Sequence, residues 1–490
     1  MNNIIEKIKK QINYENITKL VLIFILLQPL FDILSFLSIR NIIPIKISTY
    51  LKPFFVFGIA FLIYIADKRQ RKKWTILYIA FIVLIIGHML LMLNIEVELS
   101  IILHEMRFLF NIAYMLVLYM IFDYLYNKNE DKKKFIKKLR KTLILTLYIY
   151  CITIIVAILT GTSAKTYEYS DALKKGYKGW LDSGQIFGHA LSMCLPIVLF
   201  YALNNTMDNK VKKYLTKALI ILPSIVLSLI GTKATLYILI ANIIVYIILE
   251  IYFIIKDKKD HKESLTNCLI VFIIFIAIIL LFPKLPAIMN QKLQNEVDEN
   301  QLLVDNKEKD LWCKGYIDEI NKENKENNEN NENNEKKRYE EYHLHAINKI
   351  NEKFKNGSLV FSENRKKQFI YNYNKFLVSD IKYKIFGLGY LNQPLDLTIE
   401  RDILMALFGF GIMGFVVMLG TPIIIWLKSI FNILKNIRNI KFSTLMLFLS
   451  LSIFFCISFI AGYTFIYTNF SIFLVIVIQI LKARIDNKYE

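Results

Sequence analysis

The chain has 490 residues, of which 55% are hydrophobic and 21% charged, and its formal net charge at pH 7 is +20. A chain this long could hold several soluble domains, but such a hydrophobic fraction is typical of a polytopic membrane protein. The excess of cations would suggest nucleic-acid binding if it lay in one soluble domain. It lies in the segments between apolar blocks, so we expect no nucleic-acid partner.

The apolar residues form blocks of about 18 to 25 residues, the length that a helix needs to cross a bilayer. We therefore predict an all-α polytopic membrane protein with about twelve transmembrane helices. In chain order the predicted spans are 18–38, 47–66, 74–94, 105–125, 141–160, 184–203, 216–231, 233–255, 266–283, 399–427, 442–461 and 464–482.

Basic residues mark every second segment between these spans. The segments 68–73, 132–141, 210–217, 256–262 and 428–441 are rich in lysine, whereas 95–104 carries Glu96 and Glu98 and neither lysine nor arginine. The positive-inside rule then places both termini in the cytoplasm and the alternate loops outside. We expect a multi-pass protein of the cell membrane, surrounded by membrane lipids, with an even number of spans.

One connection is far longer than the others and is assigned to the outside. The predicted organisation is therefore nine spans in 1–283, a large extracellular loop at 284–398, and three spans with the cytoplasmic C-terminus in 399–490. The loop contains a low-complexity insert at 321–342, rich in Asn, Glu and Lys, for which we expect a solvated insertion or a surface helix. Residues 343–386 regain apolar side chains at helical spacing and predict helices over the membrane mouth.

Ionisable residues in the spans gather toward the outer face, and such residues mark a functional path by default. The group comprises Asp32, Lys52, His104, Glu105, Arg107, Lys233, Glu400, Arg401 and Asp402, with Lys178 in a second external loop at 161–183. The middle and inner thirds hold little beyond His88 and His189. Asp32 and Lys52 have two interpretations, a salt bridge between neighbouring helices or part of a substrate site. Charges at one interface favour an enzyme that acts on a lipid headgroup.

Four stretches of the sequence resemble the O-antigen ligase and polymerase superfamily, whose Gram-positive members are the most similar. They are LLQPLFDIL at 26–34, GTKATL at 231–236, FSENRKKQFIYNYNKFLVSDIKYKIFGLGY at 361–390 and IERDILMALFGFGIMGF at 399–415. These polytopic enzymes move glycans from a polyprenyl-diphosphate carrier on the outer face of the membrane. The resemblance implies a GT-C-like fold with one large extracytoplasmic loop before the last three helices.

The resemblance implies a glycosyltransferase whose donor is a polyprenyl-diphosphate-linked oligosaccharide. The acceptor is a second lipid-linked glycan, for a polymerase, or another cell-surface molecule, for a ligase. Members of the family usually carry arginine where Lys233 stands, and Gram-positive members often carry an acidic pair in the closing helix. We expect metal-independent transfer without a cofactor. His343 and His345 are spaced as metal ligands on a strand could be, but no nearby Cys or His completes a set.

The chemistry of this transfer suggests roles for the outer-face residues. Arg365 is the first candidate to bind the diphosphate, because its planar fork matches phosphate oxygens. Lys233, Arg107 and Arg401 would support it, and Lys178, Asp32 and Lys52 complete the candidate substrate-binding set. Glu400 or Asp402 is the candidate general base; we prefer Glu400, with Asp402 orienting Arg365 or Arg107. Alternatively, both carboxylates only favour the helix start through its dipole.

Two other functions stay open at this point. A lipid-linked glycan flippase or exporter would require cationic side chains along the helices at the membrane midplane, where the sequence places few. A membrane sensor or scaffold would bind a partner through its outer loop, and Arg365, Lys233 and Glu400 would then be replaceable with little effect.

Overall fold

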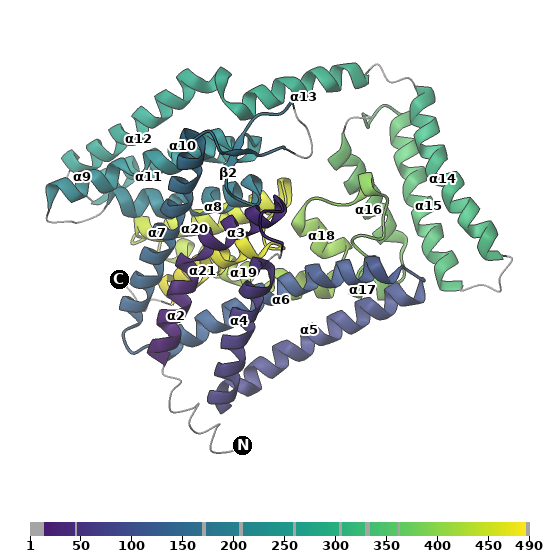
Figure 1. The fold of residues 1–490 in the computed structure, drawn as a ribbon, viewed down its shortest axis with the longest axis horizontal. Helices are drawn as coiled ribbons and strands as arrows, with labels where there is room; N and C mark the ends of the chain where they lie inside the picture. The colour runs from purple at the N-terminus through teal and green to yellow at the C-terminus, as the bar shows by residue number, and fades with distance from the viewer. Residues whose placement is uncertain are drawn as a thin grey trace.

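The computed structural model describes residues 14–44, 47–168, 173–204, 209–257, 261–302, 306–328, 334–360 and 363–486. These residues are almost entirely helical (Figure 1). The sheet in this part of the chain consists of β1 (Ala164–Lys165) and β2 (Tyr177–Gly179), which pair antiparallel with Ala164 opposite Gly179. The prediction of an all-α fold is confirmed.

The helices before the large loop are long and apolar. They are α2 (Tyr14–Leu26), α3 (Gln28–Ile39), α4 (Ile47–Ala66), α5 (Lys68–Asn94), α6 (Leu99–Lys128), α7 (Lys132–Leu159), α8 (Gly184–Leu203), α9 (Lys210–Ala218), α10 (Ile221–Leu229), α11 (Lys233–Asp257) and α12 (His261–Leu281). The short 3-10 helix η1 (Phe282–Lys284) follows, so the predicted loop boundary at 284 lies between α12 and the next helix.

The large loop and the C-terminal part are also helical. Their elements are α13 (Pro286–Leu302), α14 (Asn306–Asn328), α15 (Asn334–Lys355), α16 (Asn364–Val378), α17 (Ile381–Phe386), η2 (Leu395–Leu397), α18 (Asp402–Phe408), α19 (Gly411–Lys435), α20 (Phe442–Ile460) and α21 (Thr468–Ile485). In Figure 1, α14 and α15 lie side by side away from the helix bundle, and α16 to α18 lie between them and the bundle.

Among the described residues, nine helices are long and apolar enough to cross a membrane, and α2 with α3, bent by 47°, would make a tenth. This agrees with a polytopic membrane protein. Two predicted spans do not reach that length. The apolar helix in 47–66 is shorter, and 216–231 is divided between α9 and α10, which have nine residues each. Pro223 accounts for the break, because its ring clashes with the carbonyl group four residues earlier in a continuous helix.

The predicted span 399–427 begins later than expected. A short helix, α18, is followed by a break at Gly409 and Phe410, and the helix that can cross the membrane starts at Gly411. The turn that contains Gly387 packs against this break: Leu388 N donates to Phe408 O at 3.0 Å. Gly387 has φ +99° and a Cβ on it would lie 2.0 Å from Gly409 O, so only glycine permits the contact.

Two polar side chains from the bundle hold this glycine turn on both sides. His88 on α5 bonds through Nδ1 to Phe386 O at 2.8 Å and through Nε2 to Glu105 on α6 at 2.6 Å. The second oxygen of Glu105 accepts from Leu391 N at 2.6 Å. Both side chains are fully buried. Glu105, one of the predicted outer-face charges, therefore has a structural role, and His88 belongs with it.

The prediction for the insert 321–342 needs correction in its C-terminal part. Its last residues belong to α15, where Tyr339 and Tyr342 are buried against α17. Glu335 forms an ion pair with Lys382 of α17. This part of the insert is thus a packed helix, which its polar composition did not indicate because a few tyrosines carry the packing.

A buried polar network joins α15 to α16. Lys375 Nζ donates to Tyr339 Oη and to His343 Nε2, each at 2.8 Å, and His343 Nδ1 contacts Tyr371 Oη. Burial, and then the charge of Lys375, holds the pKa of His343 well below its usual value. His343 and His345 lie on a helix and not on a strand, so the spacing that suggested metal ligands does not apply to them.

We predict that Gly387→Ala will lower the abundance and thermal stability of the protein, because the new Cβ collides with Gly409 O and the backbone conformation excludes other residues. Such backbone strain costs about 1–3 kcal/mol. Thermal unfolding in detergent measures the effect. Gly58→Ala on α4 is the control, since nothing lies within 4 Å of a Cβ there. Equal stability of the two variants would contradict the proposed packing.

Candidate active site

Arg365 and Glu400, predicted together from the sequence, form an ion pair. Arg365 is the second residue of α16, and Glu400 lies in the extended segment before α18. Arg365 Nε and Nη2 both donate to Glu400 Oε2 at 3.3 Å, and Nη1 donates to Ile460 O at 3.2 Å. The two side chains are 41% and 42% exposed. The pair is therefore held in place while remaining open to a ligand.

Asp402 lies beside this pair, and its hydrogen bonds go to the turn after α20. Its carboxylate is 1% exposed and accepts from Tyr463 N at 3.1 Å, Thr464 N at 2.5 Å and Thr464 Oγ1 at 2.5 Å. These bonds fasten the start of α18 to the turn between α20 and α21. The expectation that Asp402 orients Arg365 or Arg107 is not met by its hydrogen bonds.

The same turn approaches the backbone of Glu400 closely. Gly462 has φ +75°, and a Cβ at this position would lie 1.9 Å from Glu400 O. Ile460, whose carbonyl group accepts from Arg365, is the last residue of α20, directly before this turn. The backbone contact and the Asp402 carboxylate thus fix Glu400 and the anchor of Arg365 relative to each other.

Arg401 adds a second guanidinium group to the site. It is half-buried, and its Nε is buried without a hydrogen-bond partner among the residues that the structure describes. Burial lowers the pKa of Arg401, the neighbouring Arg365 lowers it further, and Glu400 opposes both effects. A buried N–H group without a partner, next to a second arginine, is suited to bind an anion.

Tyrosines that the sequence analysis did not single out surround the pair. Tyr463 and Tyr467 stack with their ring centroids 6.0 Å apart. Tyr463 and Tyr390 lie within electrostatic range of Glu400, and Tyr167 lies within range of Arg365. Burial raises the pKa of Tyr167 to about 12. Half-buried rings beside fixed charges offer flat apolar surfaces with polar tips. Tyrosine is too common in this chain, with 28 copies, for the sequence to have identified them.

Lys233 is exposed at the start of α11, next to the loop 161–183. The turn before it is fastened to that loop: Thr166 Oγ1 donates to Ile230 O at 2.7 Å. Asn290 on α13 donates to Lys175 O at 2.7 Å and to Gly231 O at 2.9 Å. Because Tyr167 in the same loop is in electrostatic range of Arg365, this loop connects the Lys233 turn with the candidate site.

Lys178, in the same loop, is buried and donates to Asp182 O at 3.0 Å. Burial lowers its pKa, and the nearby charges of Asp182 and Glu168 oppose that shift. This hydrogen bond joins two residues of the loop 161–183 and stabilises its conformation.

Asp32 and Lys52 form a buried salt bridge at 2.9 Å between α3 and α4. Tyr150 Oη on α7 donates to the second oxygen of Asp32 at 2.8 Å, and Lys52 also contacts Asn469 on α21. The expected salt bridge is present and joins four helices, and the place of the pair in the substrate-binding set stays a prediction. Arg107 is exposed on α6 and forms no ion pair within the described part of the chain.

Residues 14–488 match the family model described as O-antigen ligase like membrane protein. No curated protein matches the chain. The matched range includes every candidate site residue described above, from Asp32 to the turn at Gly462.

We predict that Asp402→Asn will reduce thermal stability, because the amide has one acceptor oxygen for donors that now bind two carboxylate oxygens. A buried donor left without its acceptor costs about 1–3 kcal/mol. Glu400→Gln is the comparison and should change stability little, since exposed ion pairs contribute little. Thermal unfolding in detergent distinguishes the two, and an Asp402→Asn protein as stable as the unmodified chain would contradict the role assigned to this carboxylate.

Proposed function

The chain belongs to the O-antigen ligase-like family of membrane proteins, and from this premise we propose that it transfers or polymerises a glycan carried on a polyprenyl diphosphate. The family implies a glycosyl-transferring membrane enzyme of surface polysaccharide biosynthesis, with a lipid-linked glycan and a polysaccharide acceptor as substrates. The observation that carries the finer proposal is the half-exposed Arg365–Glu400 pair, with the Nε of Arg401 beside it lacking a hydrogen-bond partner among the described residues. We propose that the reaction takes place at the outer face.

Arg365 and Arg401 would bind the diphosphate of the donor. Negative charge grows on this leaving group as the bond between the anomeric carbon and the phosphate oxygen breaks, so fixed cations stabilise the transition state. Arg365 uses three of its five N–H groups on Glu400 and Ile460, which leaves two for phosphate oxygens. In this proposal the guanidinium groups supply the positive charge, and the transfer needs no metal.

Glu400 is the proposed general base. Both bonds from Arg365 go to Oε2, so Oε1 can accept the proton of the acceptor hydroxyl as its oxygen attacks the anomeric carbon. The polyprenyl diphosphate then leaves with the electron pair of the broken bond. Asp402 is a positioning residue, because its oxygens already accept three hydrogen bonds from the turn at 463–464.

The surrounding tyrosines and the second external loop would bind the glycan. Sugar rings present apolar faces that pack on aromatic rings, and Tyr463, Tyr390 and Tyr167 lie around the ion pair. Lys233 would support diphosphate binding from the turn next to the external loop, as a point charge without the fork of an arginine. The acceptor is a second lipid-linked glycan for a polymerase or another surface molecule for a ligase.

We predict that Arg365→Ala and Glu400→Gln will each lower polymer formation about a hundredfold or more, as expected for losing a charge-stabilising group or a general base. Arg365→Lys should restore part of the activity, because it keeps the charge but not the fork. Surface polysaccharide is measured in cells that carry only the variant, together with the amount of the protein in the membrane.

Lys366→Gln is the matched control, since it lies beside Arg365 and pairs with Glu363 in an exposed contact. Normal polymer at a normal level of the Arg365→Ala or Glu400→Gln protein would overturn the enzyme proposal and favour a sensor or scaffold. The location of lipid-linked glycan in the inactive variants tests the other alternative. Accumulation on the outer face agrees with a failed transfer, whereas accumulation only on the inner face would indicate a flippase or exporter.

A further inference from the structure

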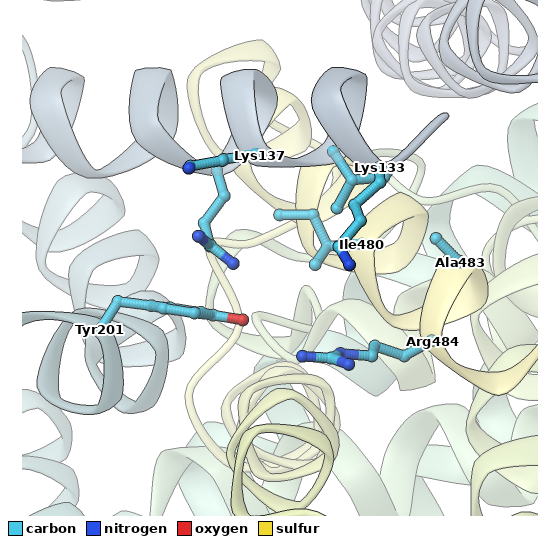
Figure 2. Close-up of a pocket in the computed structure, with 8 residues that line it drawn as sticks. Lys133, Lys137, Tyr201, Ile480, Ala483 and Arg484 are labelled. Atoms are coloured by element: carbon cyan, nitrogen blue, oxygen red, sulfur yellow. The ribbon is translucent and has the colours of Figure 1, made fainter. Parts of the chain in front are cut away.

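A second group of cations lines a pocket of about 250 Å³ between α7, α8 and α21. We call it the basic pocket. Its polar lining consists of Lys133, Lys137, Arg140, Tyr201 and Arg484, and Ile480 contributes apolar surface. Figure 2 shows Lys133 and Lys137 on one helix, with Tyr201 and Arg484 reaching into the same space from other helices. The candidate active site uses none of these residues.

The basic pocket lies at the opposite end of the helix bundle from the candidate active site. It is formed by the first turns of α7 and the last turns of α8 and α21, and α21 packs against both α7 and α8. The turn that binds Asp402 precedes α21, whose 18 residues span about 26 Å. The lysine-rich start of α7 is among the segments that the positive-inside rule assigns to the cytoplasm.

The lining of the pocket is strongly cationic without an acidic side chain among its residues. Lys133 and Lys137 are four residues apart and therefore lie on one face of α7, where like charges repel each other. Within the described residues, Lys133, Lys137 and Arg140 have no carboxylate at ion-pair distance. An anion in the pocket would relieve this repulsion.

The geometry of the arginine fixes one side of the pocket. The Arg140 guanidinium carbon lies 3.6 Å from the centroid of the Tyr201 ring, a close cation–π contact. A guanidinium group held over a ring can still donate through its N–H groups, which bind phosphate oxygens in pairs. Arg484 and the two lysines approach the same space from α21 and α7.

We propose that the basic pocket binds the phosphate group of an anionic phospholipid from the cytoplasmic leaflet. The predicted apolar span of α7 begins at 141, so Lys133 to Arg140 lie at the level of the headgroups. Ile480 and the other apolar lining side chains offer a surface for the glycerol backbone and the start of an acyl chain. Basic pockets between transmembrane helices on this side are suited to anionic headgroups. This inference does not depend on the proposed function.

The test compares lipids on the purified full-length protein in neutral detergent. Phosphatidylglycerol added in mixed micelles should raise the unfolding temperature in a saturable way, since a ligand that binds only the folded state stabilises it. Phosphatidylcholine, which has no net charge, should raise it much less. Native mass spectrometry on the same samples should show phosphatidylglycerol retained by the protein.

A charge-matched pair of double variants locates the site. Lys133→Gln with Lys137→Gln should weaken binding, so that the half-saturating concentration of phosphatidylglycerol rises about fivefold for each lysine removed. Lys134→Gln with Lys138→Gln removes the same charge from the same helix but outside the pocket lining, and should retain the affinity.

Each of the other outcomes would overturn the proposal. Equal weakening in both double variants would indicate diffuse surface electrostatics and no site. Equal stabilisation by inorganic phosphate at the same concentration would indicate a site for free phosphate. Equal effects of the two lipids on the unmodified protein would exclude selectivity for an anionic headgroup, and this comparison requires no variant to fold.

Discussion

The arrangement of the candidate active site depends on the hydrogen-bond donors that one buried carboxylate requires. Asp402 lies out of contact with solvent, where an ionised carboxylate without partners would be very costly. Three donors from Tyr463 and Thr464 supply those partners, and they are on the turn that directly follows Ile460, whose carbonyl group is bound by Arg365. The need to satisfy Asp402 thus brings the turn between α20 and α21 to the start of α18.

The other end of α18 is fixed by backbone contact. Gly387 and Gly411 both adopt positive φ, and each leaves room for a carbonyl group of the opposite segment. His88 and Glu105 hold the chain on both sides of the glycine turn. A helix of seven residues has little stability of its own, so α18 keeps its position only because both of its ends are held.

The sequence identified features that depend on local pattern. The lengths of apolar blocks predicted most of the membrane-spanning helices, and the resemblance around 361–390 and 399–415 brought Arg365 and Glu400 together in advance of the structure. What remained hidden depends on contacts between distant parts of the chain. Asp402 and Thr464 are 62 residues apart, and no periodicity relates them.

Burial was also difficult to infer for polar residues. The C-terminal part of the insert looked solvated by composition, yet its Tyr339 is buried, and no local pattern indicated that Lys178 is buried as well. The break between α9 and α10 was visible in principle, because Pro223 stands inside the predicted span. The start of α19 was not, since apolar residues continue through Gly409 and Phe410 and only the packing of two glycine turns interrupts the helix.

The position of the Arg365 guanidinium depends on more than its ion pair with Glu400. Arg365 is exposed, and an exposed ion pair with Glu400 contributes only about 0–1 kcal/mol, so the pair alone would not position the guanidinium. The carbonyl group of Ile460 and the fixed backbone of Glu400 supply the missing constraint. In the proposed function, a bound diphosphate uses the two N–H groups of Arg365 that these bonds leave over, so Arg365 stays in place. Both bonds from Arg365 then remain on Oε2 of Glu400, and under this proposal Oε1 is the oxygen that accepts the proton of the acceptor hydroxyl.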